Sequence, residues 1–165
     1  MTAELVRLAD RESALRHGDK LELKLWLRLL TCTNLIEANV RNLLRESFDT
    51  TLPRFDLLAQ LDRAPKGLTM GELGSRLMVS GGNVTGLVEA LRREGMVARK
   101  AHPGDRRSQI IRLTAKGRRF FDAMIPVHEQ WIDRLLGRMS RVDMEALFAL
   151  LGKLKLSTHS QGDAP

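Results

Sequence analysis

The chain has 165 residues, of which 43% are hydrophobic and 28% are charged, as in an ordinary globular protein. Its net charge of +7 at pH 7 favours a polyanionic partner, either nucleic acid or an anionic membrane surface. The single cysteine, Cys32, excludes an internal disulfide and a zinc-binding cysteine cluster. Because only 4% of the residues are aromatic, the core must be mainly aliphatic, which favours helices.

The sequence predicts no membrane segment. The most apolar stretch, residues 21–30, is interrupted by Glu22, Lys24 and Arg28, so it is too polar to span a bilayer. The N-terminus carries acidic residues and lacks the apolar run of a signal peptide. We therefore expect a cytoplasmic protein without a membrane partner.

The first half of the chain is predicted to be helical. Residues 20–47 carry apolar side chains on two faces, which indicates packing in a bundle or across a dimer. A threonine before Pro53 is typical of a helix start, and Thr69 with Glu72 forms a T-x-x-E capping box. The predicted helices are residues 2–16, 20–47, 54–63, 69–78 and 81–93.

A hairpin and two helices are predicted for the second half. Residues 96–102 and 109–113 read as strands on either side of a turn at residues 102–108. A long helix over residues 114–139 should be kinked by Pro126. Ser140 is predicted to cap a last helix, whose inward residues would be Met144, Leu147, Leu150, Leu151 and Leu154.

The central elements follow one another as helix, turn, helix and hairpin, which is the order of a winged helix-turn-helix domain. In such a domain one short helix supports a second, whose first turn enters the major groove of DNA. The basic tip of the hairpin can reach the neighbouring minor groove. The predicted fold class is therefore mainly α with a small β-hairpin wing and long terminal helices.

This central block resembles the MarR family of ligand-responsive transcriptional regulators, and the likeness extends over residues 20–155. Any single motif is common, but the motifs form a strong composite. They are Leu68-Thr69, Glu72-Leu73-Gly74, Ser80 to Thr85, Leu91 to Arg99, Asp105 to Arg107, and Leu113 to Gly117. The resemblance implies a homodimer with dimerisation helices in residues 1–47 and 114–156, a DNA-binding lobe in 48–113, and a disordered tail in 157–165.

The resemblance also implies which residues bind DNA. Arg107 matches the wing arginine of the family, Asp105 would hold it by a charge-assisted hydrogen bond, and Arg106 would contact phosphate. Asn83 could pair with adenine, while Thr85 could meet a phosphate or a thymine methyl or simply pack against its helix. The expected DNA-binding residues are Ser80, Gly81, Gly82, Asn83, Thr85, Asp105, Arg106 and Arg107.

Three glycines depart from the family pattern, in which Arg or Ser is frequent. Gly81, Gly82 and Gly86 each weaken a helix by roughly 1 kcal/mol relative to Ala. Gly81 and Gly82 are predicted to let the backbone approach phosphates closely. The alternative is a low intrinsic specificity with more dependence on DNA shape, and the role of Gly86 stays open.

An effector pocket is implied where the long helices meet the DNA-binding lobe. Residues 25–65 and 77–91 are also similar to a MarR subgroup that controls hydroxycinnamate catabolism and responds to aromatic acyl-CoA thioesters. Basic residues of the long helix would then face the CoA phosphates. The candidate pocket residues, which could instead belong to the core, are Trp26, Arg28, Asn34, Glu37, Arg41, Phe55 and Trp131.

No catalytic or metal-binding constellation is found in the sequence. The four histidines form no ligand set, and neither a phosphate-binding loop nor a nucleophile elbow occurs. We therefore expect no enzyme activity, no cofactor and no metal. Cys32, among Leu29, Leu30 and Ile36, is expected to be a buried, inert thiol.

The resemblance thus implies a repressor that a small aromatic effector releases from a pseudo-palindromic operator. Two alternatives stay open. One is a redox-sensing regulator that acts through Cys32, and the other is a winged-helix module for protein contacts without specific DNA binding.

Overall fold

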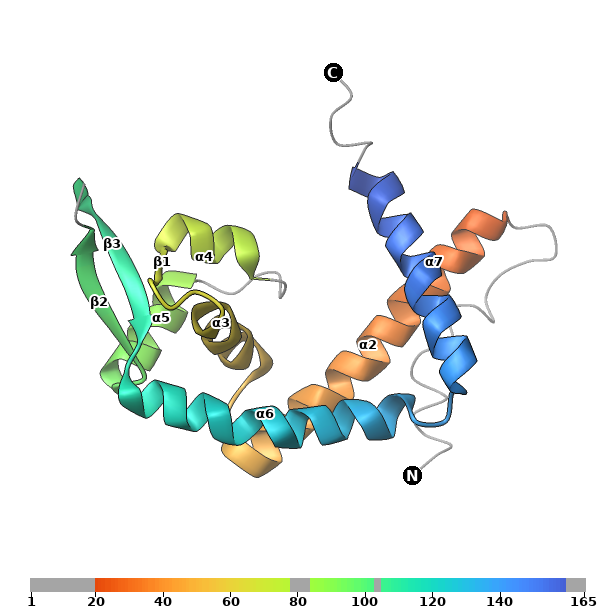
Figure 1. Cartoon of the computed structure of the whole chain (residues 1–165), viewed down its shortest axis with the longest axis horizontal. Helices are drawn as coiled ribbons and strands as arrows, with labels where there is room; N and C mark the ends of the chain where they lie inside the picture. Colours follow the sequence, from red (N-terminus) through yellow and green to blue (C-terminus); the bar gives the residue numbers. More distant parts are fainter. Residues whose placement is uncertain (1–19, 78–83, 103–104, 160–165) are drawn as a thin grey trace, which may run out of the picture. The chain divides into compact units, whose positions relative to one another are not determined.

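The computed structural model describes residues 20–77, 84–102 and 105–159 (Figure 1). The chain forms two compact units, and the boundary between them follows His128. The elements in chain order are α2 (Leu21–Phe48), α3 (Leu52–Asp62), β1 (Leu68–Thr69), α4 (Met70–Arg76), α5 (Val84–Arg93), β2 (Val97–His102), β3 (Asp105–Leu113), α6 (Ala115–Leu136) and α7 (Arg141–His159). The predicted helix at residues 2–16 lies outside the described residues, as does the predicted disordered tail from residue 160 on. The prediction of a tail from residue 157 is wrong for its first three residues, because α7 continues to His159.

The first unit contains a three-stranded antiparallel sheet in the order β1-β3-β2. The predicted fold class, mainly α with a small β wing, is confirmed. Strand β1 was not predicted; it pairs Leu68 with Ile111. The predicted turn at residues 102–108 is wrong in its second half, because β3 already begins at Asp105. Asp105 pairs with His102 across an irregularity in the ladder, so the hairpin extends further than the residue types suggest.

The core of the first unit is aliphatic, as the composition predicts. Figure 1 shows α3, α4 and α5 beside the hairpin of β2 and β3, and residues of α5 contact β2 while residues of α3 contact β3. Burying each large aliphatic side chain contributes about 1.5–3 kcal/mol. The fully buried side chains are Leu44, Leu57, Leu58, Leu61, Leu73, Val88, Leu91, Ile111 and Met124.

One junction connects the end of α5, the start of β2 and the start of α6. The Thr114 hydroxyl donates to the Gly95 carbonyl (2.6 Å) and accepts from the Gly117 N–H (3.0 Å). The Thr114 N–H donates to the Met96 carbonyl at 3.0 Å. Gly95 has a φ of 72°, and a Cβ on Gly117 would lie 1.9 Å from the Met96 oxygen. The Leu-Thr-x-x-Gly motif therefore allows the backbone at the start of α6 to approach the backbone before β2 closely.

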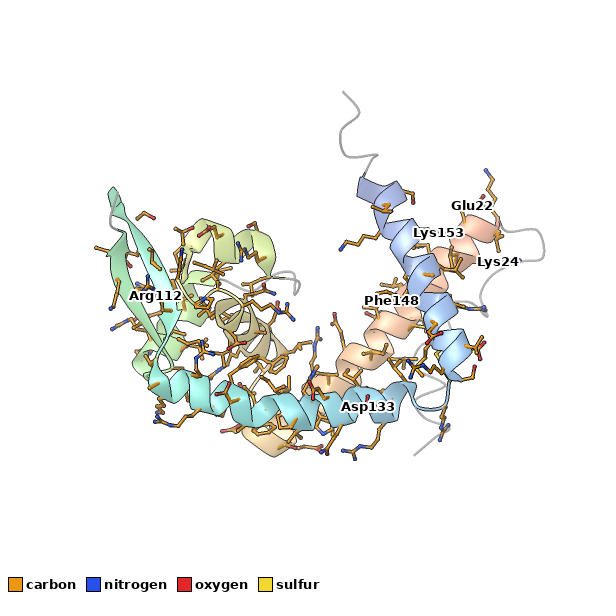
Figure 2. The ribbon with its side chains drawn as sticks, viewed as in Figure 1. Glu22, Lys24, Arg112, Asp133, Phe148 and Lys153 are labelled. Atoms are coloured by element: carbon orange, nitrogen blue, oxygen red, sulfur yellow. The ribbon has the colours of Figure 1, made fainter. Side chains whose placement is uncertain are left out.

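The second unit contains the end of α6 and α7. The predicted Ser140 cap is confirmed, because the Asp143 N–H donates to the Ser140 hydroxyl at 3.1 Å. The predicted inward face of α7 is only partly buried: Met144 and Leu154 are half-buried, whereas Leu147, Leu150 and Leu151 are 41%, 61% and 39% exposed. Phe148, labelled on α7 in Figure 2, is 82% exposed.

Gly117→Ala should lower the free energy of unfolding by about 1–3 kcal/mol, because the added Cβ forces the Met96 backbone to move. Gly74→Ala is the matched control, since a Cβ there meets nothing within 4 Å of the described chain. Ala is also the better helix former by about 1 kcal/mol at that position. Urea denaturation measures both variants, and wild-type stability for Gly117→Ala would contradict the close contact.

Candidate nucleic-acid interface

Helix α4 is fixed at its start by a capping box, as predicted. The Glu72 N–H donates to the Thr69 hydroxyl (3.3 Å), and the Thr69 N–H donates back to the Glu72 carboxylate (2.7 Å). Leu73 anchors α4 in the core, and α4 contacts α5. Val88 and Leu91 lie on the buried face of α5, and the opposite face of the helix is exposed to solvent. This is the geometry of a supported recognition helix.

Strand β1 ties this helix pair to the wing. The turn before it contains Gly67, which has a φ of 87° and whose Cβ would lie 2.4 Å from Ile110 of β3. Arg112, labelled on β3 in Figure 2, donates from Nε to the Lys66 carbonyl at 2.6 Å. The start of α4 and the middle of β3 are therefore held together by backbone and side-chain contacts.

The structure describes only part of the predicted DNA-binding set. Thr85 is exposed on the first turn of α5, as a contact residue must be. Ser80, Gly81, Gly82 and Asn83 lie outside the described residues. The backbone of Asp105, Arg106 and Arg107 forms the start of β3, at the tip of the hairpin, and their side chains lie outside the described part.

A carboxylate on α5 binds two arginines of the same lobe, which sequence analysis missed. Glu89 accepts from Arg92 Nη2 at 2.6 Å, and its other oxygen lies 3.4 Å from Arg99 Nη2 of β2. The hydrogen bond from Arg92 lowers the pKa of the Glu89 carboxyl and raises the pKa of Arg92. The i,i+3 spacing of Glu89 and Arg92 is visible in the sequence, whereas the contact with Arg99 requires the fold.

The predicted effector residues are distributed over both units. On α2, Trp26 is 57% exposed, Arg28 and Asn34 are exposed, and Glu37 pairs with Arg41 at 2.6 Å. In the second unit, Trp131 is buried. The structure thus brings Glu37 and Arg41 together.

Phe55 lies in an aromatic cluster of the first unit that sequence analysis missed. Its ring stacks on His128 with centroids 4.7 Å apart and lies 5.5 Å from Phe121. Phe55 and Phe121 belong to helices that are distant in sequence, so no local pattern could reveal the cluster. The partly buried Phe55 side chain is therefore held by α6.

Cys32 is exposed in the single chain, so the predicted burial is wrong for this state. Its apolar neighbours on α2 predicted burial, but that face of the helix is not covered: Ile36 is 37% exposed. Within the described ranges, no three His, Cys, Asp or Glu residues gather closely enough to hold a metal ion. None of the described helices is long and apolar enough to cross a membrane.

Comparison with known proteins identifies the family. Residues 48–108 match the sequence profile of the MarR family. A solved MarR family transcriptional regulator from Silicibacter pomeroyi is 33% identical, with a TM-score of 0.71 over 90% of this chain and 98% of that one. The chain belongs to the MarR family.

Curated relatives agree with this assignment. The HTH-type transcriptional regulator YkoM of Bacillus subtilis is 34% identical over 126 residues, which cover 76% of this chain and 78% of YkoM. The transcriptional activatory protein BadR of Rhodopseudomonas palustris is 31% identical over 130 residues, or 76% of this chain and 74% of BadR. The protein is thus a winged-helix transcriptional regulator of a DNA-binding family rather than an enzyme.

Proposed function

We propose that this MarR-family protein is a cytoplasmic homodimer that represses transcription from a pseudo-palindromic operator until a small aromatic effector releases it. The observation that carries the proposal is the lobe in which α4 supports α5 and β1 ties both to the β2–β3 wing. Two recognition helices in a dimer would enter major grooves about 34 Å apart. The solved MepR of Staphylococcus aureus and Sco3205 of Streptomyces coelicolor, which share this fold, are complexes with DNA.

DNA would be contacted by residues 80–83, the first turn of α5 and the tip of the wing. The residues assigned to this role are Ser80, Gly81, Gly82, Asn83, Thr85, Asp105, Arg106 and Arg107. The exposed position of Thr85 and the net charge of +7 support the assignment. Arg107 would enter the minor groove, and Arg106 would contact phosphate.

The dimer would be formed by α2 and α7. Each helix carries large apolar side chains that the single chain leaves exposed, including Leu21 and Trp26 on α2 and Val142 and Phe148 on α7. Large apolar side chains exposed in this number on each helix indicate an interaction site. A second copy would cover it with the same surface, as a two-fold interface requires.

The effector would be an aromatic acid or its CoA thioester, bound near the residues predicted for the pocket. The solved BpsR of Bordetella bronchiseptica, which has the same fold, is a protein whose DNA binding is regulated by 6-hydroxynicotinic acid. NicR of Pseudomonas putida, 31% identical over 113 residues, is a transcriptional repressor. The effector must bind the released state more tightly than the operator-bound state, since only differential affinity shifts the equilibrium.

Redox sensing through Cys32 is the second candidate, and the exposure of that thiol favours it. Cys32→Ser would abolish oxidant-dependent release of DNA if this candidate were correct. A winged-helix module for protein contacts alone is the third candidate, and it predicts no salt-dependent affinity for duplex DNA.

Arg107→Ala should weaken binding to the DNA upstream of the protein's own gene by roughly ten- to hundredfold, because the wing loses its groove contact. Titrations of labelled duplex at several salt concentrations measure this, with random duplex as reference. Arg138→Ala, which removes the same charge from an exposed site in the second unit, is the control. Binding no tighter than to random DNA at several candidate promoters would contradict the regulator itself.

Cinnamoyl-CoA-type thioesters should lower operator affinity by about 5- to 150-fold, the usual range of allosteric coupling. The same titration, repeated with thioester, with free CoA and with the free acid, separates the aromatic group from the nucleotide. Tight DNA binding that no thioester changes would discard this effector class and leave the regulator in place.

Phe148→Asp should shift the protein toward monomer, because it places a charge on the exposed apolar surface that α7 contributes to the proposed interface. Light scattering after size exclusion measures the mass. Ser157→Asp adds the same charge to α7 nine residues away, on the opposite side of the helix. A dimer in both variants would contradict the assignment of α7 to the interface.

A further inference from the structure

Glu89 lies where the recognition helix meets the wing, and its contacts indicate a role in DNA recognition. We propose that Glu89 is a specificity-determining residue: its carboxylate occupies Arg92 of α5 and Arg99 of β2, and so keeps both guanidinium groups from the phosphates of arbitrary DNA. This inference rests on the proposed function, because it assumes that α5 and the wing face DNA.

The three side chains form a small charged cluster at the surface. Glu89 accepts from Arg92 Nη2 at 2.6 Å and from Arg92 Nε at 3.2 Å, while Arg99 Nη2 lies at 3.4 Å. With Val97 and Ala98 they line an open cleft of about 470 Å³ between α5 and β2. The cluster joins two elements that would approach DNA together.

The arginines remain accessible to an incoming anion. The side chains of Arg92, Arg99 and Glu89 are 48%, 28% and 35% exposed, so solvent reaches each of them. The contact between Arg99 Nη2 and Glu89 is long, at 3.4 Å, so a phosphate could compete for this part of the guanidinium group. The Glu89 carboxylate opposes this competition, because a phosphate must displace it to bind the arginine.

The effect on specificity follows from the two parts of DNA affinity. Binding to arbitrary DNA comes from phosphate contacts, each of which adds about −0.9 to the slope of log affinity against log salt. Binding to the operator adds base and groove contacts, here assigned to residues 80–83 and to Arg107. A carboxylate that withholds two arginines therefore weakens binding to arbitrary DNA and widens the ratio between the two affinities.

The test compares Glu89→Gln with wild type in the full chain, on random duplex and on operator, over a range of salt concentrations. The proposal expects random-duplex affinity to rise about three- to tenfold at low salt and the slope to steepen by about 1 to 2. The operator-to-random ratio should fall. Asp122→Asn, which removes the same charge from an exposed site on α6, is the control. Equal behaviour of Glu89→Gln and Asp122→Asn would overturn the proposal.

A second variant keeps the proposal testable if Glu89→Gln proves unstable on heating. Arg92→Gln/Arg99→Gln should leave the salt slope of wild type unchanged, because neither guanidinium contacts a phosphate while Glu89 holds it. Adding Glu89→Gln to this background should then not steepen the slope. A slope that is shallower by about 2 in the double variant would show that both arginines already bind phosphates, and would overturn the proposal. Wild type that lacks salt-dependent duplex binding would instead refute the proposed function.

Discussion

The close approach of the start of α6 to the loop after α5 is the contact on which the winged-helix lobe depends. The Thr114 hydroxyl reaches the Gly95 carbonyl in one direction and the Gly117 N–H in the other. One side chain thereby fixes the loop between α5 and β2 to the first turn of α6. Only glycine fits at residue 117, because the Met96 carbonyl occupies the space of a Cβ. These backbone contacts therefore fix the direction of the wing relative to the direction in which α6 begins.

Charge in this lobe is partly compensated from within. Arg54 pairs with Glu94 just after α5, Arg118 pairs with Asp62, and Glu89 holds two arginines. The formal charge of +7 already subtracts these carboxylates, so the ion pairs change where positive charge lies on the surface and not its total. Exposed ion pairs contribute little to stability. The main effect of these carboxylates is therefore to determine which parts of the surface keep unpaired positive charge.

Local chemistry was predicted well from the sequence. The Thr69–Glu72 capping box and the Ser140 cap each depend on residues three positions apart, so the pattern carries the whole interaction. The helix predicted at residues 20–47 is α2, Leu21–Phe48, for the same reason: its apolar period is long and regular. The motifs of the wing likewise identified the family before any geometry was known.

Contacts between distant residues were not predicted. Strand β1 has two residues, and only their pairing with Ile110 and Ile111 of β3 makes it a strand. Asp105 to Arg107 resemble a turn in composition, since Asp is disfavoured in strands, but they belong to β3 and Asp105 pairs with His102 of β2. The contact of Glu89 with Arg99 and the cluster of Phe55 with His128 require the assembled lobe. The sequence of α2 alone could not show that Cys32 is exposed, because an apolar face is buried only where another element covers it.

Strand β1 has a consequence for how the lobe opens. Its pairing with β3 closes a long loop of chain, and both the recognition helix and the wing lie inside that loop. Loop-closure entropy rises only slowly with length, so a short seal suffices to hold a large segment. The paired side chains Leu68 and Ile111 are also buried in the core, so opening β1 would expose apolar surface as well as break the ladder. The two residues of β1 therefore close the loop and complete the core of the lobe at the same place.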